Sequence, residues 1–174
     1  MGPTEVPAPA MAAWFRAQAE VESRATVPVE ILAAYYAEEA AIERVRGDLA
    51  FVQAVHETDW FRFTGLVDAA ANNFAGLGAT GRRARPNRFP DARTGVRAQI
   101  QHLRAYADPT ATTCTAPPLH HECVDPRFRF VTPKGKAQTW QQMGNGNWAR
   151  DPEYAAAVLT LYQDLRRFAG LAAW

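Results

Sequence analysis

The residue of this sequence best suited to chemistry is Glu57, which ends an apolar segment of helical pattern. Leu49, Val52 and Val55 recur at helical spacing and predict a helix whose last turn carries Glu57. A carboxylate there meets the negative end of the helix dipole, and burial against aromatic side chains would further penalise its charge. Both effects raise the pKa of a carboxyl group toward the range that a general acid needs near neutral pH. On spacing alone, an ordinary solvated glutamate at a helix end accounts for the pattern as well.

Aromatic and carboxamide side chains near predicted turns form the second group of candidates. The rings in question are Trp60, Phe61, Phe63, Phe74, Phe89, Trp140 and Trp148. Exposed rings stack on sugars whereas buried rings belong to a core, and we expect Trp60 and Trp148 to bind substrate. Asn72 and Asn73, next to Phe74, either read sugar hydroxyl and acetamido groups or simply form a turn.

Several other chemistries lack their motifs. His56 and Glu57 begin the helix motif of zinc proteases, but Trp60 stands where the second histidine is needed. The sequence shows no glycine-rich phosphate loop and no serine in a nucleophile elbow. Cys114 and Cys123 form either a local disulfide, which requires an oxidising compartment, or two reduced thiols, and their spacing fits no standard zinc pattern. We therefore expect no metal ion and no cofactor.

The composition indicates one folded domain without a strong electrostatic bias. The chain has 174 residues, of which 48% are hydrophobic and 11% aromatic, and its formal net charge is +1. This charge gives no global attraction to nucleic acid or membrane. Arginines between residues 82 and 97 could meet an anionic polymer or form a solvated loop face. No apolar run approaches the roughly 20 residues of a membrane span, and no signal-peptide pattern is visible.

Periodicity and turn residues predict a mostly helical α+β fold. Residues 1–9 read as an extended arm and residues 10–174 as the domain. Helices are expected over residues 10–22, 28–46, 48–57, 92–107, 139–143 and 152–168. Gly47 is expected to end the second helix. Residues 61–91 are rich in turn formers and predict a small irregular lobe, with room for a β-hairpin after residue 78.

Segments 38–58, 72–78, 95–103, 124–128 and 148–155, taken in this order, resemble the bacterial glucosaminidase domain, glycoside hydrolase family 73. The resemblance runs from about residue 12 to residue 166 and is nearest to actinobacterial secreted and phage versions. It implies a lysozyme-like fold with a small lobe flanking a cleft. It also implies endo-β-N-acetylglucosaminidase activity on peptidoglycan, at the bond between N-acetylglucosamine and the following N-acetylmuramic acid.

The resemblance also implies roles for individual residues. Glu57 matches the general acid of the family. Asn72, Asn73 and Phe74 match the turn that lines the cleft, and Tyr154 matches a tyrosine that lies near the catalytic glutamate. The resemblance implies that the partner is the glycan strand of peptidoglycan. We expect the protein to be a monomer that works outside the cell or in the cell wall, with delivery by a phage as another route.

One part of the family pattern is missing, because residues 79–90 contain no second acidic residue. Asp68 and Asp91 are the nearest candidates, while Asp59 would point elsewhere on a continuing helix. Carboxyl groups about 5 Å apart suit retention and about 6.5–9.5 Å suit inversion. Without a clear partner acid we expect substrate assistance by the 2-acetamido group, with Tyr154 positioning that group or stabilising charge.

Three other functions remain open from the sequence. A muramidase or lytic transglycosylase on the same fold would cleave the other glycosidic bond. A non-catalytic module that only binds cell-wall glycan would explain the missing second acid. A cytoplasmic helical regulator would agree with the near-neutral charge and with the lack of a visible leader.

Overall fold

A computed structural model describes residues 1–18, 22–79, 85–117 and 122–174. Within these ranges the chain forms five α-helices, three short 3-10 helices and no β-strand, which confirms the mostly helical prediction. The elements in order are α1 (Ala8–Ala17), α2 (Val29–Glu43), α3 (Gly47–Glu57), η1 (Ala69–Ala71), α4 (Ala92–Ala107), η2 (Phe128–Phe130), η3 (Trp140–Gln142) and α5 (Tyr154–Phe168). No helix in the described ranges is both long and apolar enough to cross a bilayer.

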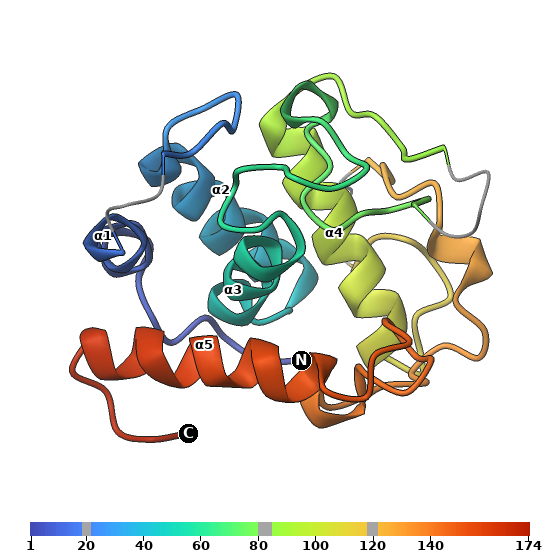
Figure 1. Ribbon diagram of the computed structural model, residues 1–174. Coiled ribbons are helices and arrows are strands. Elements are labelled where there is room, and N and C mark those ends of the chain that lie inside the picture. Colours follow the sequence, from blue (N-terminus) through green and yellow to red (C-terminus); the bar gives the residue numbers. More distant parts are fainter. Residues whose placement is uncertain (19–21, 80–84, 118–121) are drawn as a thin grey trace.

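Helix α3 is the centre of the fold. It packs against α1, α2, α4 and α5, and every residue from Gly47 to Val55 is buried. Figure 1 shows α3 nearly end-on, with the other four helices arranged around it. Because the helix is enclosed up to its last turn, the side chain of Glu57 leaves the core at the point where the surrounding helices open.

The helix boundaries follow local chemistry. Helix α4 has the predicted bounds, and Asp91 caps it by accepting the Thr94 N–H at 2.8 Å. The prediction for Gly47 is wrong, because α2 ends at Glu43, Arg44 after it is left-handed, and Gly47 begins α3. A Cβ on Gly47 would lie 2.6 Å from the carbonyl oxygen of Tyr36, so glycine permits the close approach of α2 and α3.

Helix α3 stops at Glu57 because the chain then makes a left-handed turn. Asp59, Trp60 and Phe61 have φ angles of 51°, 59° and 55°. A left-handed backbone costs about 1–2 kcal/mol for each such residue. The turn is held by the complete burial of Phe61 and by the Thr58 hydroxyl, which accepts the Phe61 N–H at 2.9 Å.

The lobe between α3 and α4 is irregular, as predicted, but it contains no hairpin in its described part. The buried side chain of Asn73 replaces a backbone ladder. Its Nδ2 donates to the carbonyl oxygens of Leu77 and Asn87, both at 2.9 Å, and its Oδ1 accepts the Leu77 N–H at 2.9 Å. One carboxamide therefore joins the two sides of the loop. Residues 80–84, which belong to the expected hairpin, lie outside the described residues.

The segment after α4 is closed by a disulfide between Cys114 and Cys123, whose Cα atoms are 5.4 Å apart. Helix α4 holds the C-terminal side of this segment through the buried side chain of Gln101. Its Oε1 accepts the N–H groups of Val124 and Asp125 at 2.9 and 3.1 Å. The bridge and the glutamine together fix where the chain enters the 125–137 segment beside α4.

Candidate active site

Glu57 is held by two hydrogen bonds that reach it from distant parts of the chain. Its Oε1 accepts the Tyr154 hydroxyl at 2.5 Å and the Trp148 indole N–H at 2.9 Å. Its Oε2 accepts no hydrogen bond from the described residues and lies toward the turn at Gly76, where a Cβ would be 3.8 Å from it. The two oxygens therefore differ, because one is fixed by the scaffold and the other is free to meet a ligand.

The environment favours the neutral form of Glu57. Burial raises the pKa of the Glu57 carboxyl above its usual range and outweighs Tyr154, Trp148 and His56, which act to lower it. Burial also raises the pKa of the Tyr154 phenol well above its ordinary value, and the charge of Glu57 adds to that rise. At neutral pH Tyr154 therefore keeps its proton and donates it in the hydrogen bond to Glu57.

A chain of buried hydrogen bonds continues behind Tyr154. Gln53 Nε2 donates to the Tyr154 hydroxyl at 2.9 Å, and Gln99 Nε2 donates to Gln53 Oε1 at 2.8 Å. Tyr36 then donates from its hydroxyl to Gln99 Oε1 at 2.6 Å. Each donor points along the chain toward Glu57, so the direction of the Tyr154 hydroxyl is set by residues from α2, α3 and α4.

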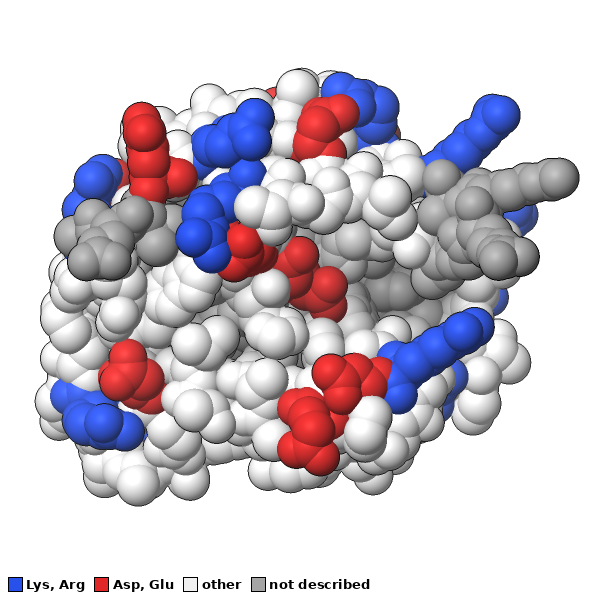
Figure 2. Space-filling model, viewed as in Figure 1, with Lys and Arg blue, Asp and Glu red and all other residues white. Residues whose placement is uncertain are grey.

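A cavity of about 280 Å³ opens beside Glu57. Its lining includes Glu57, Asp59, Asn73 and Gly76, together with residues 63–67. Figure 2 shows this face of the molecule hollowed near its centre, with acidic side chains beside the hollow. The end of α3 and the irregular lobe thus form the two walls of a cleft that could hold an extended ligand.

The three residues of the predicted cleft turn have different environments. Asn73 lines the cavity although its amide groups are used within the loop. Asn72 is buried, accepts the Thr26 hydroxyl and donates to the Phe89 carbonyl oxygen at 3.2 Å. Phe74 is buried in the main core. Asn72 and Phe74 therefore support the turn from the core side. They line neither the Glu57 cavity nor a second, smaller cavity, which Gly76, His102 and Trp148 line.

This turn is docked directly on α4. A Cβ on Gly95 would lie 1.8 Å from the carbonyl oxygen of Asn72, so only glycine allows the two backbones to approach so closely. The position of the turn relative to Glu57 is consequently fixed by helix α4 as well as by the loop's own hydrogen bonds.

The two tryptophans expected to bind substrate lie on opposite sides of α3. Trp148 donates to Glu57 and lines a second cavity, so it belongs to the site. Trp60 packs against Trp14 and Phe15 of α1, with ring centroids 5.2 and 5.8 Å apart, and lines neither cavity next to Glu57. The left-handed turn after α3 carries Trp60 away from the cleft.

The candidate second acids are also separated by the structure. Asp68 is exposed and pairs with Arg88 at 2.8 Å, and Asp91 caps α4; neither lines the Glu57 cavity. Asp59 does line it, because the helix ends at Glu57 and our assumption that it continues is wrong. The hydrogen bond from Arg62 holds the pKa of Asp59 below its ordinary value, so Asp59 is ionised at neutral pH.

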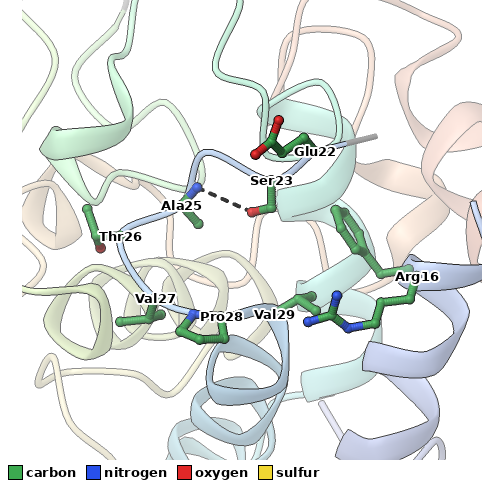
Figure 3. A pocket seen from close by; sticks show the side chains of 9 residues that line it. Arg16, Glu22, Ser23, Ala25, Thr26, Val27, Pro28 and Val29 are labelled. Carbon is green, nitrogen blue, oxygen red and sulfur yellow. Dashed lines mark hydrogen bonds between the residues drawn. The ribbon is translucent and has the colours of Figure 1, made fainter. Parts of the chain in front are cut away.

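A larger cavity lies elsewhere. It has a volume of about 400 Å³ and is formed between the end of α1 and the segment that leads into α2. Figure 3 shows its lining, in which two charged side chains, Arg16 and Glu22, accompany small polar and apolar residues. It shares no residue with the Glu57 cavity and offers no paired acid and base. In the described part of the chain, no three His, Cys, Asp or Glu side chains gather as metal ligands.

Comparison with known proteins identifies the family. Residues 33–167 match the glucosaminidase family, described as mannosyl-glycoprotein endo-beta-N-acetylglucosaminidase. The chain belongs to the glucosaminidase family. It is also 35% identical over 140 residues to an uncharacterized protein of Borreliella burgdorferi, a match that covers 80% of this chain and 64% of that protein. Membership of the glucosaminidase family indicates glycoside hydrolase activity.

The part of this glucosaminidase domain that the sequence did not reveal is the support of the acid. Gln53 precedes Glu57 by four residues and so lies on the same face of the helix, a spacing that could have identified it. Gln99 carries no such signal, because its partners come from other helices. Tyr154 and Trp148 were singled out, but their shared hydrogen bond to one oxygen of Glu57 follows only from the fold.

Proposed function

We propose that this glucosaminidase domain hydrolyses the glycan strands of peptidoglycan, between N-acetylglucosamine and the following N-acetylmuramic acid. Glu57 is the general acid of this reaction, and the cavity beside it holds the sugars at the cleaved bond. One observation carries the proposal: a carboxyl group of raised pKa, fixed at Oε1 and free at Oε2, faces a cleft in a member of a glycosidase family.

The acid step uses the difference between the two oxygens of Glu57. Oε1 accepts two hydrogen bonds, so the proton resides on Oε2, from which it passes to the glycosidic oxygen as the bond to the leaving sugar breaks. The carboxylate left behind is stabilised by Tyr154 and Trp148, because hydrogen bonds to an ionised acceptor are strong. The same two donors therefore assist the transition state, in which this charge develops.

For the second catalytic group we propose the substrate's own 2-acetamido oxygen. It attacks the anomeric carbon while the leaving group departs, and water then opens the cyclic intermediate after giving a proton to Glu57. The environments of the two candidate acids support this proposal. Asp68 pairs with Arg88, and Asp91 caps the start of α4. Asp59 is the rival, since it lines the cavity and is ionised. An inverted product, measured by NMR, would exclude the acetamido route and favour Asp59 as base.

The test of the function compares Glu57→Gln with Glu38→Gln, the same change at an exposed position of α2. Glutamine keeps an oxygen for Tyr154 and Trp148 but has no proton to give, so wall hydrolysis falls by at least about a hundredfold. Glu38→Gln keeps wild-type activity. Hydrolysis of purified cell walls is measured as the loss of turbidity of the suspension, and the new reducing ends are identified by mass spectrometry.

The reducing end also separates the alternatives. N-acetylglucosamine at the new end supports the proposed bond, whereas muramic acid, free or anhydro, indicates a muramidase or lytic transglycosylase. Walls that pellet with the protein but lose no turbidity indicate a binding module. Full activity in Glu57→Gln contradicts the assignment of the acid.

We also propose that the domain works outside the cytoplasm, in the cell wall. The disulfide between Cys114 and Cys123 supports this location, because such bonds persist in oxidising compartments. The substrate supports it too, since peptidoglycan lies outside the membrane.

A further inference from the structure

The cleft continues past Trp148 into a second cavity of about 140 Å³. Gly76 lines both cavities. Trp148 lines the second cavity, and its indole N–H donates to Glu57, which lines the first. The indole ring of Trp148 also packs against His102 and Tyr106, with ring centroids 5.3 and 5.2 Å away. A glycan strand bound across Glu57 would place a neighbouring sugar unit in this aromatic cavity.

Arg127 lines this cavity, and two further cations, Arg129 and Lys136, lie against aromatic rings of its lining. The guanidinium of Arg127 lies 4.5 Å from the centre of the Phe130 ring, and that of Arg129 lies 4.8 Å from the same ring. Lys136 adds a third cation, 5.6 Å from the centre of the Tyr106 ring. Within the described residues no carboxylate forms an ion pair with any of the three.

Asp125, an acid close to these cations, already has other hydrogen-bond partners. Asp125 is buried and contacts His102 Nδ1 at 2.8 Å through Oδ2. Its Oδ1 accepts the backbone N–H of Arg127 at 2.8 Å, so the carboxylate positions the chain of Arg127 without meeting its guanidinium. The guanidinium groups of Arg127 and Arg129 lie against one exposed ring, and a bound anion would supply the counter-charge that the described carboxylates do not.

We propose that this second cavity binds a carboxylate of the muramic acid unit, with the Arg127 guanidinium as its ligand. The inference rests on the proposed function. Peptidoglycan alternates a neutral acetamido sugar with one whose lactyl ether ends in a carboxyl group, which is either free or extended by a peptide with carboxylates of its own. Trp148 and Tyr106 contact the sugar ring, and the planar guanidinium pairs with two carboxylate oxygens at once. A neutral sugar would make no use of this charge.

The test measures binding of soluble glycan strands in the Glu57→Gln background, so that no hydrolysis occurs during the measurement. Three strands are compared: peptide-bearing strands, strands stripped of peptide by an amidase so that only the lactyl carboxylate remains, and peptide-bearing strands whose carboxylates are converted to amides. We expect Glu57→Gln to bind at least one carboxylate-bearing strand about tenfold more tightly than the amidated strand, as one charge-assisted hydrogen bond provides.

The variants then locate the recognition. Adding Arg127→Gln removes the tenfold preference, whereas adding Arg167→Gln, a change at an exposed arginine near the end of α5, keeps it. A preference for stripped strands assigns the lactyl carboxylate, and a preference for peptide-bearing strands alone assigns the peptide. Equal binding of all three strands, or a preference that survives Arg127→Gln, overturns the proposal. Hydrolysis by the wild-type protein is measured separately, so that failure of the proposed function is seen on its own.

Discussion

At the scale of single residues, Glu57 combines two opposed influences. Burial disfavours its charge, while Tyr154 and Trp148 donate to Oε1 and favour that charge. In the proposed reaction, the first influence favours the protonated acid that is needed at the start, and the second favours the carboxylate that is left when the proton has been transferred. Both fall on one side chain because the end of α3 lies at the border between the core and the cleft.

This balance predicts the effect of Tyr154→Phe on the pH profile. The hydrogen bond from Tyr154 lowers the pKa of Glu57, so its loss moves this pKa further above the ordinary value. A general acid must be protonated, hence activity is lost as pH rises through its pKa, and the alkaline limb of kcat/KM shifts to higher pH in the variant. The rate itself falls by about tenfold or more, because the carboxylate loses a donor. The measurement is kcat/KM on soluble glycan strands from pH 4 to pH 9.

Tyr35→Phe is the matched control, since Tyr35 lies on α2 with its ring under Arg93 and lines neither cavity of the cleft. It keeps the wild-type profile. A limb that moves to lower pH in Tyr154→Phe would mean that the phenol does not donate to Glu57 in solution.

The sequence predicted Glu57 as a candidate from helical spacing and from the family resemblance, and it predicted Tyr154 from the resemblance alone. It did not indicate that Asp59 lines the Glu57 cavity or that Trp60 points away from it. Left-handed backbone is usually signalled by glycine or asparagine, and residues 58–61 contain neither. The direction of these side chains follows from the burial of Phe61, a tertiary effect that outweighs the local preference.

At the scale of elements, the chain of hydrogen bonds behind Glu57 is assembled by four helices, each contributing one residue. Tyr36 comes from α2, Gln53 from α3, Gln99 from α4 and Tyr154 from α5. The helices bury apolar side chains around this chain of hydrogen bonds, so each polar group depends on its neighbours for a partner. Displacement of any one of these helices would therefore disturb the hydrogen bond from Tyr154 to Glu57.

Gln99→Leu tests this dependence. Leucine has a similar volume but leaves the Tyr36 hydroxyl and Gln53 Oε1 without their partners, and each orphaned buried group costs about 1–3 kcal/mol. The free energy of unfolding, measured in urea, is expected to fall by about 3 kcal/mol.

A double-variant cycle provides the control. Tyr36→Phe removes one of the groups that Gln99→Leu leaves unpaired, so the double variant loses less stability than the sum of the single variants. Strict additivity would show that the two side chains are not coupled.

The positions of the helices were largely predictable, because apolar residues recur at helical spacing in α4 and α5 and turn formers separate the elements. The internal hydrogen bonds were not. Gln53 and Asp48 look like solvent-facing positions of α3, yet this helix is enclosed on all sides. Whether a polar residue faces water or another helix is decided by packing between elements, which a single helical pattern does not contain.

At the scale of the whole molecule, the N-terminal segment and helix α5 meet at the start of α3. Figure 1 shows the N-terminal segment running along α5. Asp48 accepts the backbone N–H groups of Glu5 and Val6 at 3.0 and 3.1 Å and the Tyr162 hydroxyl at 3.0 Å. Burial acts to raise the pKa of Asp48, but its ion pair with Arg46 holds that pKa below the ordinary value.

The composition of residues 1–9 predicted an extended arm, and in the structure residues 1–7 form no helix. The expected boundary at residue 10 nevertheless falls inside α1, which begins at Ala8 with proline in its first turn. Val6 is completely buried and belongs to the main core. A proline-rich stretch with one apolar residue gives no sign of this, because the groups that receive it come from α3 and α5.

Val6→Ala shows whether the segment is part of the fold in solution. Removing two buried methyl groups and leaving a cavity is expected to lower the free energy of unfolding by about 2 kcal/mol, measured by urea denaturation. Leu66→Ala is the control: its side chain is 78% exposed, so the change stays within about 0.5 kcal/mol. Equal, small effects of the two substitutions would mean that residues 1–7 are not docked. A large effect of Val6→Ala would show that the core around α3, and with it the position of Glu57, includes the first residues of the chain.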